Sequence, residues 1–437
     1  MKALTKKLTS LLIAMSILCT LIPQINALTP ITEDLFICKR GLSNMSGGSV
    51  LIEAYERIAE CIEKREEYAD LSDLNMKLST LDLVHNAVRN DPNGYFWLDT
   101  TYSYRYNTSS QLTTQYIPNY NSLAGDSLSD VRRNKKVFEA AARTMIEDAG
   151  IDRTTSEYRA ELLLHDAIVA KTVYEEGTNA HNEYGAIVEG KAVCQGYTLA
   201  FQYLLRLCGI NACSVVGYAG EPHSWNLVMI DGDYYYTDVT WDDASSAQSA
   251  DRRDMYYAYF NVTEAVLRQD HSWEEPAYGL PECTSVKKNY FTQNPRHKHT
   301  QSSLTVDKVS ALFYDGFARI YATDGNVTAI KDWFFNNAVS IAQKCGYDLT
   351  KPTSALYEYS QNEIHLFIDG VLSGPVSVFG DLNKDNALNS LDQNYLRRII
   401  TGLLIPTKNQ IIAADADSNG KLNPIDANNI TRLILDN

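Results

Sequence analysis

Hydrophobic residues recur with two different periods along this chain, and the change of period marks the predicted elements. Residues 51–70 have helical spacing and carry charges on their outer face. Residues 95–120 contain alternating stretches that predict a β hairpin. Both patterns together predict the α+β fold class. Residues 303–370 are predicted to form a small α/β unit with a strand near 311–321, a helix over 327–345 and strands near 356–359 and 364–368.

A predicted helix over residues 193–208 carries a cysteine in its first turn, and Gly209 is a natural stop for it. At Cys194 the unpaired amides and the dipole of the helix favour a thiolate and lower the pKa of the thiol. The same amides could hold an oxyanion on a substrate carbonyl. Taken alone, the cysteine fits a buried structural role better. The apolar face of the helix consists of Val193, Tyr197, Phe201, Leu204, Leu205 and Cys208.

The segments that follow predict a hairpin. Residues 223–230 and 233–240 are strand-like, and Asp231 and Gly232 between them are a strong signal for a two-residue turn. A three-residue loop would reverse which residues share a face. The two-residue turn pairs Met229 with Tyr234, Trp225 with Asp238, and His223 with Thr240.

This register makes Asp238 a diagonal neighbour of His223 on one face, about 7–8 Å away between backbones, which the side chains can span. His223 would take the proton of the Cys194 thiol, and Asp238 would orient the imidazole and stabilise its charged form. We therefore predict that Cys194, His223 and Asp238 form a catalytic triad.

These segments resemble the core of transglutaminase-like proteins, within the papain-related cysteine protease superfamily, and especially secreted bacterial members. The resemblance rests on residues 190–197, 223–226 and 236–243, and it extends from about residue 71 to about residue 291. It implies a helix-borne cysteine packed on an antiparallel sheet. Weaker candidates for the substrate cleft are Gln195, Trp225 and Tyr184, for which structural roles serve at least as well. Three histidines without metal-spaced partners are predicted to lie at the surface: His271, His297 and His299.

The last 57 residues contain one calcium-loop pattern twice, 34 residues apart. Oxygen-bearing side chains occupy loop positions 1, 3, 5, 9 and 12, and position 7 offers a backbone carbonyl, which suits calcium. The register continues beyond the loops, since Leu396 matches Ile430, so a helix is predicted after each loop. The predicted ligands are Asp381, Asn383, Asp385, Ala387, Asn389 and Asp392 in the first loop, and Asp415, Asp417, Asn419, Lys421, Asn423 and Asp426 in the second.

This duplicated F-hand arrangement resembles type I dockerin modules, which attach secreted enzymes to cohesins on a scaffold protein, as in cellulosomes. The resemblance implies an all-α module, two structural Ca²⁺ ions and a cohesin partner. Loop positions 10 and 11, where dockerins tend to contact cohesin, differ between the copies, so the two faces need not bind alike. These positions are Ser390 and Leu391 in the first copy, and Pro424 and Ile425 in the second.

The N-terminus and the charge of the chain agree with export. Three lysines precede an apolar run over residues 11–22, which predicts a signal peptide over residues 1–27 and an extracellular protein. Its removal changes the net charge from −15 to −18, because 1–27 holds three lysines and no acids. That charge disfavours nucleic acid and anionic membranes as partners. No second long apolar run predicts a membrane span, and the pairing of the remaining cysteines is open.

The leading functional hypothesis is a secreted, scaffold-anchored cysteine hydrolase of peptide or amide bonds, acting on a protein or peptide. Two alternatives remain open: transfer of a glutamine acyl group to an amine, and a non-catalytic binding or adhesive component of a polysaccharide-degrading complex. The predicted domains are a signal peptide (1–27), an N-terminal α/β region (28–150), the core (151–291), the small α/β unit (303–370), a linker (371–379) and the dockerin (380–437).

Overall fold

The computed structural model describes residues 45–370 except 90, 92–93, 244–254, 275–279 and 314–315, together with Leu42 and eight positions between 382 and 430. The predicted signal peptide and linker, and all the predicted calcium ligands and cohesin contacts, lie outside the described residues. Contacts divide the chain into two compact units. Unit 1 holds the described residues up to Trp241 together with Asn261–Ser285. Unit 2 holds Asp242 and Asp243, the described segment that ends at Phe260, and the described residues from Val286.

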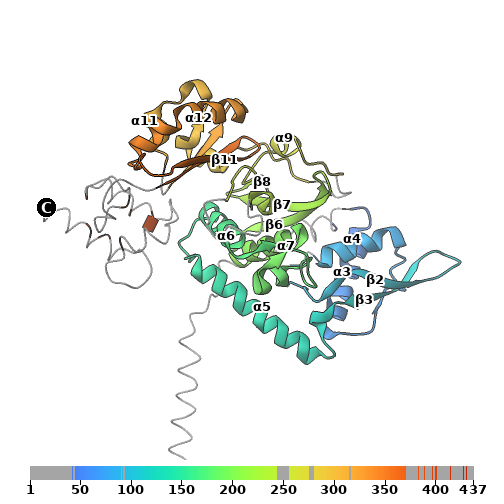
Figure 1. The fold of residues 1–437 in the computed structure, drawn as a ribbon. Coiled ribbons are helices and arrows are strands. Elements are labelled where there is room, and N and C mark those ends of the chain that lie inside the picture. The colour runs from blue at the N-terminus through green and yellow to red at the C-terminus, as the bar shows by residue number, and fades with distance from the viewer. Residues whose placement is uncertain are drawn as a thin grey trace, which may run out of the picture. The chain divides into compact units, whose positions relative to one another are not determined.

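The first part of unit 1 joins two helices to a small antiparallel sheet (Figure 1). The predicted helix at 51–70 is confirmed but ends at Lys64, because Arg65 turns left-handed at φ 55°. The predicted hairpin at 95–120 is confirmed as well. The elements are α3 (Gly48–Lys64), α4 (Leu78–Arg89), β1 (Ala69–Asp70), β2 (Leu98–Tyr106) and β3 (Thr113–Tyr120), with strand order β1-β3-β2.

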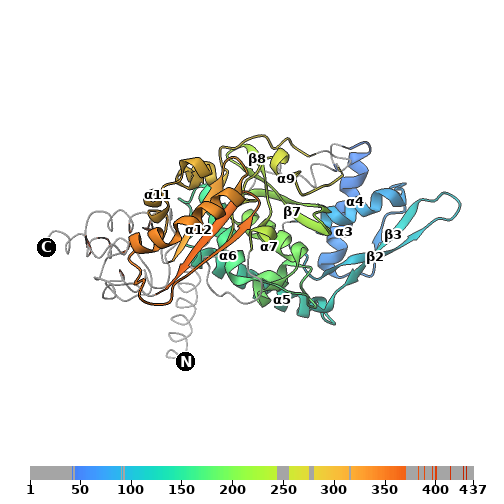
Figure 2. The same cartoon turned by 45° about the horizontal axis from the view of Figure 1, so that its top comes forward.

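The second part of unit 1 packs helices against a three-stranded antiparallel sheet of order β6-β7-β8. The helix α7 lies on β6 and β7 (Figure 1, Figure 2). Most of its side chains are buried, since α6 covers it as well. The elements are α5 (Leu128–Asp148), α6 (Glu157–Lys171), β4 (Val173–Tyr174), a π-helical turn (Gly185–Glu189), β5 (Lys191–Ala192), α7 (Cys194–Leu207), β6 (Asn211–Tyr218), β7 (Pro222–Ile230), β8 (Asp233–Thr237), α8 (Val239–Asp242) and α9 (Glu264–Leu267).

The hairpin register predicted from the two-residue turn is confirmed where the strands pair. Met229 lies opposite Tyr234, and both turn residues have positive φ, 50° at Asp231 and 86° at Gly232. The ladder, however, ends at Thr237, so the predicted pairs of Trp225 with Asp238 and of His223 with Thr240 are wrong.

Asp238 ends the strand by capping a helical turn. Its Oδ1 accepts the backbone N–H groups of Thr240, at 3.0 Å, and Trp241, at 3.1 Å. A carboxylate that satisfies the first amides of a helix favours helix over a continued strand. The four-residue helix α8 follows directly.

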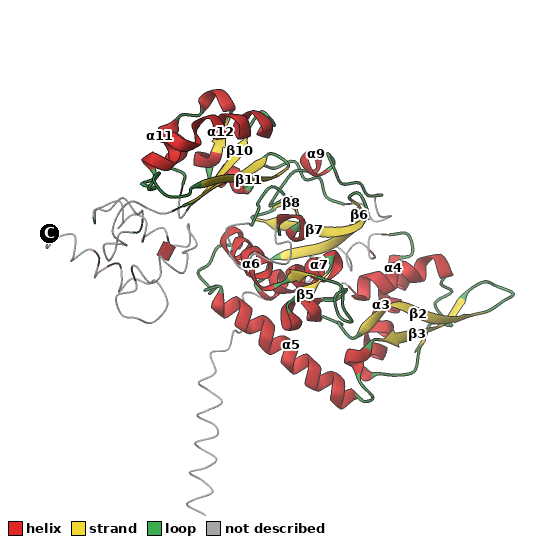
Figure 3. Cartoon of the chain, viewed as in Figure 1, coloured by secondary structure: helices red, strands yellow, loops and turns green. Residues whose placement is uncertain are grey.

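Unit 2 is a four-stranded sheet of order β11-β12-β10-β9 with the helix α12 across one face (Figure 3). The predicted helix at 327–345 and the last two predicted strands are confirmed. The strand predicted near 311–321 begins only at Phe317, because a short helix ends at Ser310 and its C-cap, Ala311, still has helical backbone angles. The elements are α10 (Tyr290–Gln293), β9 (Lys298–His299), α11 (Val306–Ser310), β10 (Phe317–Ala322), α12 (Val327–Lys344), β11 (Ser354–Ser360) and β12 (Glu363–Asp369).

The described positions near the C-terminus form a buried apolar cluster of their own. Leu396 and Ile430, which are equivalent in the two sequence repeats, are both helical and both 0% exposed. Leu382, Ile399 and Ala414 complete the cluster. Both repeats therefore contribute to one core. Within the described part of the chain, no helix is both long and apolar enough to cross a bilayer.

Candidate active site

Cys194 is the first residue of α7, and the segment before it is held tightly in place. The N–H of Val193 donates to the carbonyl of Ala180 at 3.0 Å. Gly196, in the first turn, lets that segment approach, because a Cβ there would lie 2.3 Å from the Ala180 oxygen. The structure therefore confirms the helix start predicted from the sequence and fixes the thiol at it.

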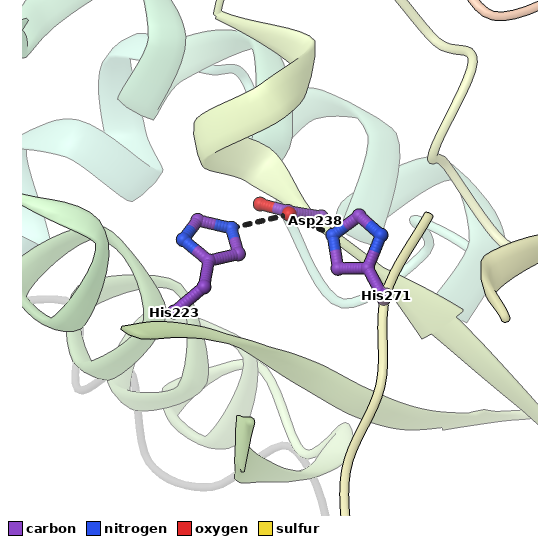
Figure 4. Close-up of side chains that lie close together, drawn as sticks. All are labelled: His223, Asp238 and His271. Atoms are coloured by element: carbon purple, nitrogen blue, oxygen red, sulfur yellow. Dashed lines mark hydrogen bonds and ion pairs between the residues drawn. The ribbon is translucent and has the colours of Figure 1, made fainter. Parts of the chain in front are cut away.

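His223 and Asp238 meet in the interior of unit 1. The Nε2 atom of His223, on β7, lies 2.7 Å from Oδ2 of Asp238, and both side chains are buried (Figure 4). The other carboxylate oxygen of Asp238 binds the start of α8, so the carboxylate cannot rotate freely. The contact predicted between His223 and Asp238 thus exists, although a capping turn and not a strand pair produces it.

Neutral hydrogen bonds tie β7 to the helix that carries the cysteine. Thr198, one turn after Cys194, has its hydroxyl 3.1 Å from that of Ser224. The side-chain amide of Asn226 donates to the backbone carbonyl of Thr198 at 3.0 Å. Ser224 and Asn226 follow His223 on β7, so these bonds help to set where the imidazole lies relative to the thiol.

Electrostatics distinguish Cys194 from other cysteines of the chain. Burial alone would raise the pKa of its thiol, but hydrogen bonding and charge interaction with His223 outweigh burial and lower that pKa. Burial raises the pKa of Cys61, Cys208 and Cys283 to about 12. A low thiol pKa is the property that makes a cysteine nucleophilic.

The pKa values of His223 and Asp238 are shifted in complementary directions. Burial alone would lower the pKa of His223, but the charge and hydrogen bond of Asp238 outweigh it and raise the pKa to about 10. Burial alone would raise the pKa of Asp238, but the charge of His223 and hydrogen bonds from both histidines lower it to about 2. The three groups therefore favour a thiolate, an imidazolium and a carboxylate.

The three weaker candidates of the sequence take different places. With its amide oxygen turned towards Arg89, Gln195 accepts two hydrogen bonds of 3.1 and 3.2 Å from that guanidinium, which links α7 to α4. Trp225 is fully buried, with its ring centroid 6.0 Å from that of His223. Tyr184 packs against Phe96, with ring centroids 5.2 Å apart. Gln195 and Tyr184 therefore join the helix that carries Cys194, and its neighbourhood, to the N-terminal part of unit 1.

The prediction that His271 lies at the surface is wrong. Its side chain is buried, its Nε2 lies 3.0 Å from Oδ2 of Asp238, and its Nδ1 lies 2.6 Å from Asp270 (Figure 4). Spacing could not reveal the contact, because 33 residues separate His271 from Asp238. One sequence signal was available: the tripeptide His-Ser-Trp occurs twice, at 223–225 and at 271–273.

The other two histidines predicted at the surface are also more enclosed than expected. His297 is buried, with its Nδ1 3.0 Å from the backbone carbonyl of Arg319, and burial lowers its pKa to about 3. His299 is half-buried, with its Nε2 2.9 Å from the carbonyl of Arg296.

The ligand-type atoms of His223, Asp238 and His271 all lie within 4.8 Å of one another, a spacing compatible with a metal ion. Both imidazole nitrogens, however, lie at hydrogen-bond distance from the same carboxylate oxygen, at 2.7 and 3.0 Å. Hydrogen bonds from the two imidazole N–H groups to that oxygen account for the close spacing of the three side chains.

Comparison with known proteins identifies two modules. The model of the Transglutaminase-like superfamily matches residues 144–239, and the model of the Dockerin type I domain matches residues 379–435. No curated protein matches the chain. A solved structure described as a crystal structure of a TGase matches with 16% identity and a TM-score of 0.23, over 36% of this chain and 46% of that one. Both resemblances inferred from the sequence are thus confirmed by the family models.

Proposed function

We propose that this protein, with its transglutaminase-like domain and its C-terminal type I dockerin, is an extracellular cysteine hydrolase of peptide or amide bonds carried on a cohesin-bearing scaffold. One observation carries the proposal: the thiol of Cys194 at the start of α7 is coupled to His223, which is bonded at 2.7 Å to Asp238. Nucleophile, base and orienting carboxylate are the three parts that acyl transfer by a cysteine needs.

In the first half of the reaction, the Cys194 thiolate attacks the carbonyl carbon and forms the C–S bond. The carbonyl oxygen takes the negative charge, and the unpaired amides at the start of α7 stabilise it. His223 then gives its proton to the leaving nitrogen, the C–N bond breaks and a thioester remains. Asp238 stabilises the imidazolium until that proton leaves.

In the second half, His223 accepts a proton from water as the water oxygen attacks the thioester carbon. Collapse of this intermediate releases the carboxylic acid and returns the thiolate. An amine in place of water would give a new amide, which is the transglutaminase outcome. The two outcomes use the same three residues and differ only in the molecule that reaches the thioester.

One experiment separates the outcomes. Casein and a labelled primary amine are incubated with wild type, with Cys194→Ala and with Cys345→Ala. Cys345→Ala is the control, because Cys345 is a free cysteine of unit 2 and burial raises the pKa of its thiol. We expect wild type and Cys345→Ala to release peptides, and Cys194→Ala to release none. Incorporation of the amine in place of peptide release would reassign the activity to acyl transfer. If neither signal depends on Cys194, the protein is not a cysteine enzyme of this kind.

The C-terminal module would serve attachment. The two loops fit Ca²⁺ by their donor chemistry, because each offers five oxygen-bearing side chains and one backbone carbonyl to a cation that prefers oxygen. The ions would be structural, coupled to folding of the apolar cluster shared by both repeats. We expect cohesin binding to be lost in chelator and in Asp381→Ala combined with Asp415→Ala. Binding that persists in both would contradict the proposal.

A further inference from the structure

The carboxylate of Asp238 is shared by two imidazoles. His223 and His271 stand on either side of it, and both point an Nε2 atom at the same oxygen, at 2.7 and 3.0 Å (Figure 4). The second nitrogen of His271 faces another carboxylate, Asp270, at 2.6 Å. A carboxylate oxygen can only accept a proton, so an imidazole placed between two carboxylates satisfies both only with a proton on each nitrogen. This geometry favours the imidazolium form of His271.

The fold places His271 there by close packing. The segment after it pairs with the end of β6, where Tyr218 and Ser272 exchange two backbone hydrogen bonds of 2.8 Å. This approach requires Gly217, because a Cβ there would lie 2.3 Å from the Ser272 oxygen. The indole rings of Trp225 and Trp241 enclose the imidazole, with centroids 5.0 and 4.6 Å away.

We propose that His271 is a positioning residue of the site: a second imidazolium that holds Asp238 and competes with His223 for the charge of its carboxylate. The inference rests on the proposed function, in which Cys194 and His223 are the reacting pair. His223 must both keep a proton beside the thiolate and give it up to the leaving nitrogen. A partner that takes part of the Asp238 charge makes that release easier.

The sign of the effect follows from the groups around His271. The titratable groups placed against it include Asp238, Asp270 and His223, whose ring centroid is 5.7 Å away. Removal of a positive charge raises the pKa of each neighbouring acid. At this distance the change amounts to about one pH unit or more for His223 and less for Cys194.

The test follows the rate at which iodoacetamide alkylates Cys194 as a function of pH, measured on the Cys194 peptide by mass spectrometry. The rate reports formation of the thiolate at acid pH and loss of the His223 proton at alkaline pH. His271→Gln retains an N–H for Asp238 and removes the charge. His181→Gln is the control, since His181 is an exposed histidine of the same unit that faces Glu176 at 3.4 Å.

In His271→Gln we expect both steps of the profile to move to higher pH, the alkaline step by about one unit, while His181→Gln leaves both unmoved. A folded His271→Gln protein with the wild-type profile would overturn the proposal. Alkylation needs no substrate, so absence of peptide cleavage with a moved profile would reject the proposed function alone. Cleavage that depends on Cys194 with an unmoved profile would reject this inference alone.

A second measurement decides the matter if His271→Gln does not fold. The side chain of Asp270 is 29% exposed, so Asp270→Asn disturbs the interior little. In protein with ¹³C-labelled histidine, one imidazolium signal of wild type should titrate at a pH at least about one unit lower in Asp270→Asn. Histidine titrations identical in the two proteins would overturn the doubly protonated state of His271.

Discussion

Two buried carboxylates, Asp238 in unit 1 and Glu363 in unit 2, are built alike and differ in one chemical respect. Each is 0% exposed and accepts bonds from two basic side chains, and backbone N–H groups add two bonds at Asp238 and one at Glu363. Glu363 binds the guanidinium of Arg319, and its Oε1 lies 2.7 Å from Nε2 of His365. Burial alone would raise the pKa of Glu363, but the charge of Arg319 outweighs it and lowers that pKa.

The difference lies in whether one partner keeps its charge at every pH, since Glu363 has a guanidinium beside the imidazole of His365 whereas Asp238 has two imidazoles. A guanidinium stays charged at every pH that a protein tolerates, so the pair of Glu363 and Arg319 is permanent. Both partners of Asp238 are imidazoles, and one of them is coupled to a thiol. A buried ion cluster is therefore no sign of catalysis by itself. Partners that exchange protons beside a nucleophile distinguish the candidate site from a structural cluster.

The largest expected effect tests this distinction through activity. In Asp238→Asn the amide would present N–H groups or a neutral oxygen to two imidazoles that need a negative charge. We expect kcat for peptide release to fall by about 10³ to 10⁴-fold. The matched change in unit 2, Glu363→Gln, should leave kcat of the folded protein unchanged. Equal losses in both variants would show that the two clusters act alike and would remove the argument for catalysis at Asp238.

The second prediction concerns stability in unit 2. Glu363→Gln leaves Arg319 buried without its carboxylate, which should destabilise unit 2 by about 3–5 kcal/mol. Urea dependence of hydrogen exchange in the amides of α12 measures the effect. The control is Asp307→Asn, which breaks an exposed pair between Asp307 and Lys344 and should cost less than about 1 kcal/mol. If both variants cost the same, the buried pair is no stronger than a surface one.

The sequence predicted the cysteine, the histidine and the aspartate because each follows from a local pattern. A helix start places Cys194, and the turn at Asp231 and Gly232 sets the strand register around His223. The end of the strand ladder could not be predicted from the sequence. The capping hydrogen bonds of Asp238 compete with strand pairing, and the alternation of polar and apolar residues carries no sign of that competition. The helical turn of α8 is the result.

Contacts between segments far apart in the sequence were the other feature that could not be predicted. His271 reaches Asp238 through the close approach of its segment to Gly217 and Tyr218 on β6, a strand that the sequence pattern did not predict. In unit 2, Arg319 and Glu363 pair across neighbouring strands, and no local pattern marks either residue. Such contacts depend on three-dimensional packing, which periodicity along the chain cannot encode.

The third prediction uses pH to separate the units. His223 has a folded pKa raised to about 10, so its contribution to stability is complete below its unfolded value of about 6.5 and is lost as pH rises towards 10. In unit 2, the pKa of His297 is lowered to about 3, so its contribution is present above about 6.5 and is lost as pH falls.

Between pH 6.5 and 10, hydrogen exchange should therefore accelerate in the amides of α7 more than in those of α12, after correction for the intrinsic pH dependence of exchange. Asp238→Asn removes the group that raises the pKa of His223, so this variant should lose most of the alkaline effect. An alkaline loss of equal size in α7 and α12, or one that persists in Asp238→Asn, would contradict the assignment.

The smallest expected effect tests how far charge alone aligns the thiol and the imidazole of the candidate site. Thr198→Val removes the hydroxyl that lies 3.1 Å from Ser224 but retains the backbone carbonyl that accepts from Asn226. Loss of one neutral hydrogen bond costs about 1 kcal/mol. If all of that free energy is lost from the alignment of thiol and imidazole, peptide release should slow by about fivefold. Because no charge changes, the pH profile of Cys194 alkylation should stay where it is. A loss as large as that of Asp238→Asn would mean that the neutral link between α7 and β7, and not the charge of the carboxylate, controls the reacting pair.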